Sequence, residues 1–196
     1  MSELSDEEML SLFRGAEPGE KSQAFNLIFR KYKESVYHLI RRMVIDHDDT
    51  DDLVQNTFVN IWNNLDKFRE ESKLYTWIYR IATTKSIDFI RSKKSKKRFA
   101  FIYRLGAPGD KENVSIPDFH HPGVVSERKE QAAQLFQAIA QLPENQKTAF
   151  ILTRLEQLSH AAVAEIMGIT VPAVESLLHR GRVNLKKLLD KKADLM

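Results

Sequence analysis

The sequence contains no cysteine and has little glycine, proline and tryptophan. Its 196 residues include seven glycines, six prolines and two tryptophans. The lack of cysteine excludes disulfide bonds and thiolate metal sites, and the scarcity of glycine and proline favours helices over a turn-rich β protein. No run of about 18 apolar residues occurs, and the first residues are acidic, unlike a secretory signal. We therefore expect a cytoplasmic protein.

The net charge of +3 is distributed unevenly along the chain. Residues 1–20 carry six acidic side chains and one arginine, whereas residues 73–104 carry ten lysines or arginines and one aspartate. Such a dense basic segment is typical of a surface that binds a polyanion, for example a nucleic acid. A solvated helix end has the same composition, so the charge pattern alone leaves both interpretations open.

Residues 158–189 have the pattern of two helices joined by a tight turn. Apolar residues recur at helical spacing up to Met167, and Gly168 follows as the residue type that most easily ends a helix in the left-handed conformation. Thr170 can cap the next helix, and Pro172 suits its first turn. The second helix then combines an apolar stripe with basic side chains. This pattern is typical of a helix-turn-helix that binds the DNA major groove, although an ordinary helical hairpin shares the spacing.

The rest of the chain shows helical periodicity and no convincing strand alternation. Apolar residues three and four positions apart predict helices over residues 4–13, 21–45, 46–64, 74–92, 128–142 and 143–158. Proline and glycine concentrate in residues 104–125, which indicates a connector. We therefore expect an all-α fold of two small helical domains, the second with a helix-turn-helix. The expected parts are an N-terminal extension (1–20), a first domain (21–98), a linker (99–127) and a second domain (128–196).

Five aspartates lie within residues 46–52 and raise the question of a metal site. Aspartates suit a helix N-terminus, where they accept free N–H groups and oppose the positive end of the helix dipole. A calcium-binding loop is the alternative, but its sixth and twelfth positions hold Asp51 and Thr57 instead of glycine and glutamate. His120 and His121 have no third candidate ligand at helical spacing. We expect neither a metal nor a cofactor.

The predicted helix over residues 74–92 mixes aromatic and basic side chains. This combination suits single-stranded DNA, because bases stack on aromatic rings while cations hold the phosphate backbone. The alternative is that the aromatic rings belong to the core, which we expect for Trp77 more than for Tyr75. Tyr79 is expected on the polar face with Arg80.

Three motifs, in this order, resemble bacterial extracytoplasmic-function (ECF) sigma factors of the sigma-70 family. They are DDLVQNTFVNIW, then FREESKLYTWIYRIA with a basic tail, and, after the connector, LPENQKTAFILTRLEQLSHAAVAEIMGITVPAVESLLHRGRVNLKKLL. The resemblance covers about residues 21–98 and 128–190. It implies a dissociable promoter-specificity subunit of RNA polymerase, with no enzymatic activity and no small-molecule substrate. The first domain would bind core polymerase and open the −10 element, and the second would read the −35 element as duplex.

The resemblance also implies which residues bind each partner. In the family the DDLVQxTF helix docks on a coiled coil of the largest polymerase subunit, which implies contacts from Asp51, Asp52, Leu53, Gln55, Asn56, Thr57 and Phe58. The −10 contacts, which require a base flipped out of the duplex, would come from Phe68, Arg69, Ser72, Lys73, Tyr75, Trp77, Arg80, Thr84, Lys85, Arg91, Lys93 and Lys94. The −35 contacts would come from Thr170, Pro172, Ala173, Glu175, Ser176, His179, Arg180, Arg182 and Lys186.

The chain departs from the family pattern at three positions, two of which belong to the contact sets above. Thr84 stands where asparagine is common, and Glu175 and Leu177 stand where many members carry a cation. Glutamate can accept a hydrogen bond from the cytosine amino group, but it repels phosphate. We therefore expect residues 128–196 alone to bind DNA weakly, with specificity depending on a polymerase that tethers both domains.

Two other classes of function compete with this interpretation. A stand-alone helix-turn-helix regulator explains the last third of the chain, but it gives no role to residues 46–64 and 74–92 and predicts a symmetric dimer. A nuclease needs carboxylates that converge on a metal ion. The sequence contains no P-loop, dinucleotide-binding fingerprint or HExxH motif.

The resemblance further implies control by an anti-sigma factor, which in this family is often membrane-bound. Such a partner wedges between the two domains or wraps around them. The apolar residues 99–103 and the connector that follows are compatible with that arrangement. The alternative is that the two domains pack on each other and hide their DNA-binding surfaces.

Overall fold

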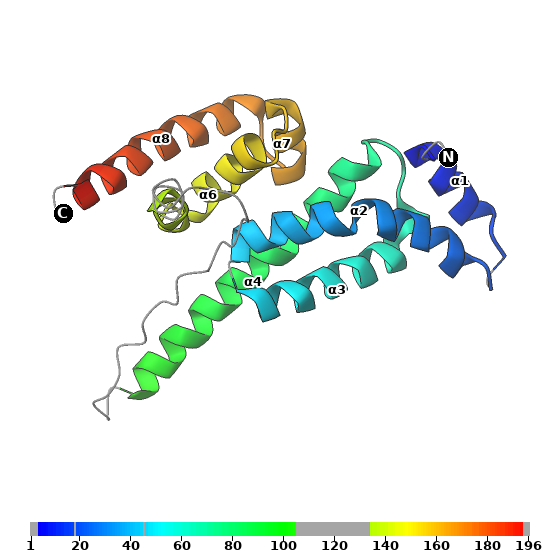
Figure 1. Ribbon diagram of the computed structural model, residues 1–196, viewed down its shortest axis with the longest axis horizontal. Coiled ribbons are helices and arrows are strands. Elements are labelled where there is room, and N and C mark those ends of the chain that lie inside the picture. Colours follow the sequence, from blue (N-terminus) through cyan, green and yellow to red (C-terminus); the bar gives the residue numbers. More distant parts are fainter. Residues whose placement is uncertain (1–3, 18, 45, 105–133, 194–196) are drawn as a thin grey trace, which may run out of the picture. The chain divides into compact units, whose positions relative to one another are not determined.

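The computed structural model describes residues 4–17, 19–44, 46–104 and 134–193, and every regular element in these ranges is a helix (Figure 1). The prediction of an all-α fold is therefore confirmed for the described residues. The chain divides into two compact units, Met1–Ser86 and Ile87–Met196. Most of the predicted linker lies outside the described residues, and the division falls within helix α4.

The first unit contains α1 (Asp6–Gly15), α2 (Lys21–Val44), α3 (His47–Asn64), a short 3₁₀ turn (Leu65–Lys67) and the first part of α4 (Leu74–Arg104). Capping side chains start two of these helices. The Ser5 side chain and Glu8 form a reciprocal capping box at α1, and the Asp46 carboxylate accepts a hydrogen bond from the backbone N–H of Asp49 at α3. The aspartate-rich segment thus begins a helix, as predicted.

The core of the first unit forms along one face of α2. Ile28, Val36, Leu39 and Ile40 are fully buried there, at the three- and four-residue spacing that the sequence predicts. The surrounding helices contribute further buried side chains, which include Met9, Leu10, Phe13, Leu53, Phe58, Ile61, Leu74 and Ile78. Helix α1 packs on α2 and is therefore part of this core, although the sequence suggests only a terminal extension.

Three expectations for the first unit are wrong. Helical periodicity over residues 46–64 predicts Trp62 in the buried stripe with Leu53 and Phe58, but it is 37% exposed, with its ring edge-on to Phe13 and Phe25. Tyr79 was expected on the polar face of its helix, but it is buried, with 8% of its surface exposed. Helix α4 was expected to end near Ser92, yet it continues to Arg104, because lysine and arginine are good helix formers even in a dense basic run.

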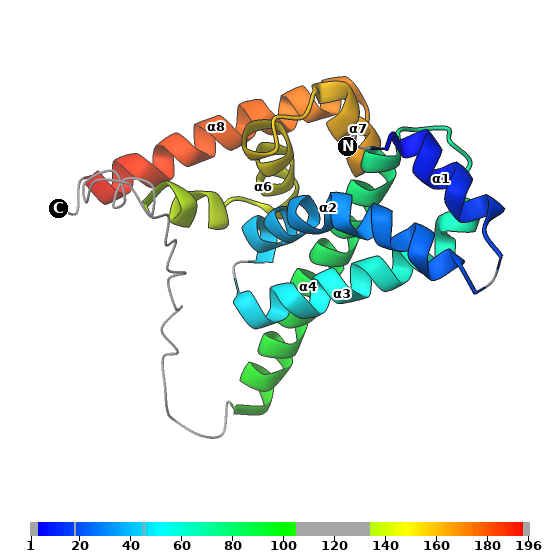
Figure 2. The same ribbon diagram turned by 45° about the vertical axis from the view of Figure 1, so that its right-hand side comes forward.

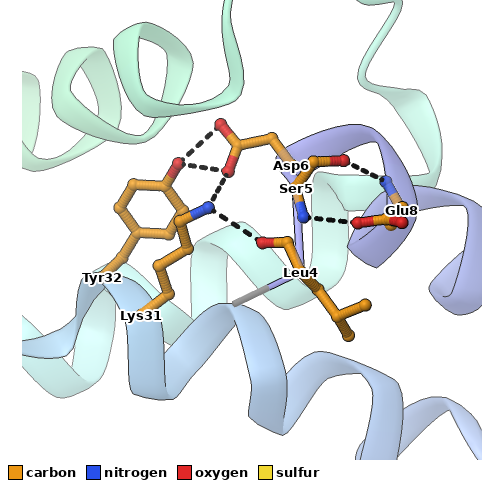
Figure 3. A network of polar contacts seen from close by, with 6 residues as sticks. All are labelled: Leu4, Ser5, Asp6, Glu8, Lys31 and Tyr32. Carbon is orange, nitrogen blue, oxygen red and sulfur yellow. Dashed lines mark hydrogen bonds and ion pairs between the residues drawn. The ribbon is translucent and has the colours of Figure 1, made fainter. Parts of the chain in front are cut away.

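A polar network joins the start of α1 to the middle of α2 (Figure 3). The Tyr32 hydroxyl donates to the Asp6 carboxylate, with oxygen–oxygen distances of 2.8 and 2.7 Å, and the Lys31 ammonium lies 2.8 Å from the same carboxylate. Lys31 also donates to the backbone oxygen of Leu4. Burial, together with the neighbouring Asp6 carboxylate, raises the pKa of Tyr32 far above its ordinary value. The Tyr32–Asp6 hydrogen bond therefore depends on the Tyr32 proton, whereas the Lys31–Asp6 ion pair does not.

Tyr32→Phe should lower the free energy of unfolding by about 1–2 kcal/mol, because it removes a part-buried hydrogen bond to a charged acceptor. Tyr37→Phe is the matched control, since the Tyr37 hydroxyl makes only a long 3.4 Å contact with the His47 ring. It should change stability by less than about 0.5 kcal/mol. Urea unfolding measures both, and equal losses would contradict the role assigned to the Tyr32 hydroxyl.

The same network predicts a dependence on alkaline pH. Above pH 10.0, the ordinary tyrosine value, the unfolded chain loses the Tyr32 proton while the folded chain keeps it. Tyr32 therefore stabilises the fold below that pH, and its contribution falls by about 1.4 kcal/mol per pH unit above it. Subtracting the unfolding free energy of Tyr32→Phe from that of the wild type between pH 9 and 11, a range set by the ordinary pKa of about 10, should isolate this slope.

The second unit contains a helical segment over residues 134–140, α6 (Glu144–Phe150), a π-helical turn (Ile151–Leu155), α7 (His160–Met167) and α8 (Val171–Ala193). Its core consists of Ala138, Ile139, Leu142, Ala149, Ile151, Leu152, Val163, Ile166, Val174, Leu178 and Leu185. Pro143 caps α6 from just outside rather than opening it from the first helical position. Helical periodicity predicts Val183 in the apolar stripe of α8, and Phe150 and Leu155 in that of residues 143–158. Val183 is instead 43% exposed, and Phe150 and Leu155 are half-buried.

Among the described residues, no single helix has the length and apolar character needed to span a membrane. Only α7 and α8 taken together, as a pair bent by 99°, satisfy that criterion of length and composition.

Candidate functional site

Helix α3 divides the residues of the predicted polymerase-binding motif between two faces. Leu53, Thr57 and Phe58 are buried, so their side chains pack in the core and are not available to a partner. The remaining predicted residues, Asp51, Asp52, Gln55 and Asn56, are exposed. This face therefore begins with two carboxylates and continues with two amides.

Two apolar residues extend the exposed face of α3. Val59 and Trp62 follow Gln55 at helical spacing, and Val59 is 53% exposed. An exposed tryptophan beside an exposed valine is a surface feature that partner proteins commonly cover. Neither residue was predicted in the polymerase contact set. For Val59 a signal was available, because it lies one helical turn after Gln55, whereas the exposure of Trp62 is evident only from the structure.

The loop between the 3₁₀ turn and α4 carries the first residues of the predicted −10 set. Phe68 is buried against the Trp77 ring, with ring centroids 5.1 Å apart, so its side chain cannot stack on a base. Arg69 and Lys73 are exposed, and Ser72 is half-buried. The loop thus has polar side chains, and the packing of Phe68 against Trp77 fixes the position of its first residue.

One face of α4 continues from this loop. Trp77, Arg80, Thr84 and Arg91 follow one another at intervals of three, four and seven residues, which places them on the same side of the helix. Arg80, Thr84 and Arg91 are exposed, as are Lys93 and Lys94, whereas Tyr75, Trp77 and Lys85 are half-buried. A half-buried ring followed by exposed cations is compatible with the predicted binding of a nucleic-acid strand.

The helix-turn-helix predicted from the sequence is present as α7, a turn and α8. The Ser159 side chain caps α7 by accepting from the backbone N–H of Ala162 at 3.2 Å. Gly168 ends α7 with a φ of +65°, and the Ile169 N–H bonds back to the Ala164 carbonyl at 3.0 Å. Thr170 accepts from the Ala173 N–H at 3.4 Å, so it begins α8 as expected.

The outward face of α8 carries most of the predicted −35 residues. Those exposed are Thr170, Pro172, Glu175, Ser176, His179, Arg180, Arg182 and Lys186, while Ala173 is half-buried. Val174, Leu178 and Leu185 hold the opposite face in the core. A side-chain hydrogen bond of 2.9 Å between Asn184 and Gln146 ties α8 to α6. This exposed face is therefore supported by buried side chains on the opposite side of α8.

Two contacts on this face are not evident from the sequence. The Glu175 carboxylate lies 3.6 Å from Nδ1 of His160, the first residue of α7. The Arg180 guanidinium donates to the Ser176 hydroxyl at 3.1 Å, one helical turn earlier. Both contacts restrict the orientations of side chains that would otherwise sample many rotamers in solvent.

The residues described by the structure contain no group of three or more His, Asp or Glu side chains placed to hold a metal ion. In the aspartate-rich segment, Asp46 serves as a helix cap and Asp51 lies 3.3 Å from the His47 ring. His120 and His121 lie outside the described residues. Asp48 and Asp49 lie in the first turn of α3, where the helix dipole favours negative charge.

Comparison with known proteins gives two family matches. Sigma-70 region 2 matches residues 28–96, and Sigma-70, region 4 matches residues 132–185. The chain is 33% identical over 172 residues to the ECF RNA polymerase sigma factor SigW of Bacillus subtilis, covering 85% of this chain and 89% of that protein. It is 30% identical over 186 residues to the RNA polymerase sigma-H factor of Pseudomonas aeruginosa, covering 95% and 96%.

Two solved structures share the fold. CnrH, in complex with the cytosolic domain of CnrY, has a TM-score of 0.64 and 22% identity, covering 93% of this chain and 96% of that one. The sigma factor RpoE of Bartonella quintana, in complex with the anti-sigma factor NepR, has a TM-score of 0.61 and 21% identity, with coverages of 86% and 98%.

Two glycines of the helix-turn-helix should respond oppositely to alanine. Gly168→Ala should lower the free energy of unfolding by about 1–2 kcal/mol, because Cβ strains the left-handed conformation. Gly181→Ala should raise it by up to about 1 kcal/mol, because alanine favours a helix interior. The added Cβ of Gly181 would meet Gln146 Cβ at an ordinary 3.7 Å. Urea unfolding tests the pair, and effects of the same sign would contradict the turn geometry.

Proposed function

The chain belongs to the extracytoplasmic-function sigma factors of the sigma-70 family, and we propose that exposed faces of α3, α4 and α8 bind its three partners. It is an RNA polymerase sigma factor, which directs core polymerase to specific promoters and helps to open the −10 element. The assignment of these faces rests on the different side chains that each of them exposes. Helix α3 exposes carboxylates, amides and a tryptophan, whereas α4 and α8 expose cations.

Core polymerase binds the exposed face of α3 in this proposal. Asp51 and Asp52 supply negative charge, Gln55 and Asn56 supply hydrogen bonds, and Trp62 supplies apolar area beside Val59. A basic pair of partner helices complements this combination of groups. Leu53, Thr57 and Phe58 contribute indirectly, because their burial orients the exposed face.

Changing Asp51, Asp52 and Gln55 to alanine should weaken core-polymerase binding about tenfold, or about 1.4 kcal/mol, through the loss of charge complementarity and hydrogen bonding. Co-elution on a sizing column and titration of labelled chain with core polymerase measure the effect. The matched control is the double variant Glu34→Ala with Asp190→Ala, which also removes two negative charges, but from exposed positions outside α3. If both variants bind like the wild type, the α3 face is not the docking surface.

The −10 element binds at the loop and the first turns of α4 in this proposal. Reading a base on its Watson–Crick edge requires that the base leave the stack and enter a pocket. Arg69, Ser72 and Lys73 provide polar groups for such a base, and Arg80 and Thr84 continue that surface along α4. The exposed cations Arg91, Lys93 and Lys94 then hold phosphates. The region 2 match over residues 28–96 supports this assignment.

The −35 element binds α8 as duplex in this proposal. The two proposed domains extend over residues 21–98 and 128–196. Arg180, Arg182 and Lys186 suit phosphates or guanine edges, and Glu175 suits the amino group of cytosine. The side chains are exposed on one helix that follows a helix-turn-helix turn, which is the geometry of a major-groove reader. Glu175 also reduces the attraction to phosphate.

Glu175→Gln in the reconstituted holoenzyme should raise duplex affinity about two- to fivefold at low salt, because it removes a carboxylate that the DNA phosphates repel. It should also weaken the preference for cytosine at one −35 position. Asp190→Asn is the matched control, since it neutralises another exposed carboxylate of the same helix. Selection from a randomised duplex library measures both properties, and an unchanged base preference would remove Glu175 from the reading face.

Control by an anti-sigma factor completes the proposal. RpoE of Bartonella quintana was determined in complex with the anti-sigma factor NepR, and CnrH in complex with the cytosolic domain of CnrY. The shared fold extends over most of this chain, which supports an equivalent partner here. Such a partner would compete with core polymerase and promoter DNA for the chain. Self-packing of the two domains is the alternative, and small-angle scattering of the free chain distinguishes them.

A further inference from the structure

Helix α1 lies outside the residues matched by sigma-70 region 2, yet it contacts the loop assigned to the −10 element. Figures 1 and 2 show the chain between α3 and α4 passing beside α1. We propose, on the basis of the function proposed above, that Arg14 of α1 is a positioning residue for −10 recognition, which holds this loop in its base-reading conformation.

Arg14 contacts the loop at two points. Its guanidinium donates to the backbone carbonyl of Phe68 and forms an ion pair with the Glu70 carboxylate. The fork of a guanidinium suits such a double contact, because its donors point in fixed directions. Arg14 thus bridges two loop positions that flank Arg69, whose side chain is exposed.

The backbone at Glu70 needs such support. Its φ is +58°, a left-handed conformation that a residue with a Cβ rarely adopts. A strained residue of this kind persists only where surrounding contacts determine it, and such residues concentrate at binding sites. The Arg14 ion pair is a contact of this type, since it reaches the strained residue itself.

A second cation, Lys21, binds the 3₁₀ turn that leads into the same loop. The Lys21 ammonium lies 2.9 Å from both Asp66 carboxylate oxygens and 4.9 Å from the centre of the Phe13 ring. Phe13 precedes Arg14, is buried, and packs against Trp62 at 5.6 Å between ring centroids. Arg14 is therefore mounted on a fixed helix and can transmit that order to the loop.

This support leaves the ligand-facing side of the loop exposed. Arg69, Glu71 and Lys73 are exposed, whereas Arg14 contacts the loop at Phe68 and Glu70. A loop already held in its bound conformation loses less entropy on binding, so it binds more tightly and discriminates more sharply. Arg14 would thus act on DNA through the loop, without touching DNA.

The test uses holoenzyme reconstituted from core polymerase and the full chain, with a single-stranded DNA library randomised at six positions. Sequencing the bound fraction gives the base preferences. Arg14→Ala should reduce enrichment of the preferred bases about fivefold, with Arg14→Lys intermediate because it keeps the charge but loses the fork. Arg30→Ala is the control, since it removes an exposed cation from α2, and it should keep the wild-type preferences.

Two further readouts separate positioning from other roles. If Arg14 acts through Glu70, Arg14→Ala with Glu70→Ala should lose little more enrichment than either single variant. The salt dependence of binding should also stay unchanged in Arg14→Ala, whereas a direct phosphate contact would lower its slope by about one. Wild-type enrichment by Arg14→Ala, additive losses, or a lower slope would each overturn the inference.

The same experiment distinguishes this inference from the proposed function. If the wild type enters holoenzyme and enriches a motif while Arg14→Ala enriches it equally, only the role of Arg14 fails. If wild-type holoenzyme enriches no motif, base reading by the loop fails and the inference fails with it. Arg14→Ala must keep a cooperative thermal transition and core-polymerase binding, and Arg14→Lys provides the same test with a smaller perturbation of the fold.

Discussion

The burial of one face of α2 is the constraint on which the first unit depends. Ile28, Val36, Leu39 and Ile40 lose all contact with water, and α1 and α3 pack against their helix. Full burial of such side chains contributes about 1.5–3 kcal/mol each, far more than an exposed ion pair. The functional faces are what remains once this packing is satisfied. Their positions therefore follow from the core and not from any attraction between the functional residues themselves.

Helix α3 shows how a single motif serves both core and surface. Residues of DDLVQNTF alternate between the interior and solvent, so Asp51 and Gln55 project outward because Leu53 and Phe58 project inward. A family resemblance does not distinguish these two roles, because it identifies the motif but not the direction of each side chain. Burial separates them. The same holds for the −10 set, in which Phe68 supports the loop from below while Arg69 faces solvent.

Long-range polar contacts give α1 a place in this arrangement. Asp6 binds Tyr32 and Lys31 at one end of the helix, and Arg14 binds the loop before α4 at the other. These contacts join residues 25 to 56 positions apart in the chain. Each is modest by itself, but together with the buried Phe13 they couple the N-terminal helix to the surface assigned to DNA.

Local sequence patterns account for the helical class, the Asp46 and Thr170 caps and the left-handed turn at Gly168, because each depends on residues within a few positions of one another. Periodicity also identified the buried side of α2. The exposure of Trp62, the burial of Tyr79 and the contact between Arg14 and Glu70 depend instead on how the helices pack. The physical reason is that periodicity defines the direction of an apolar stripe but not its width. That width, and the partner of a long charged side chain, depend on helices brought together from distant parts of the chain.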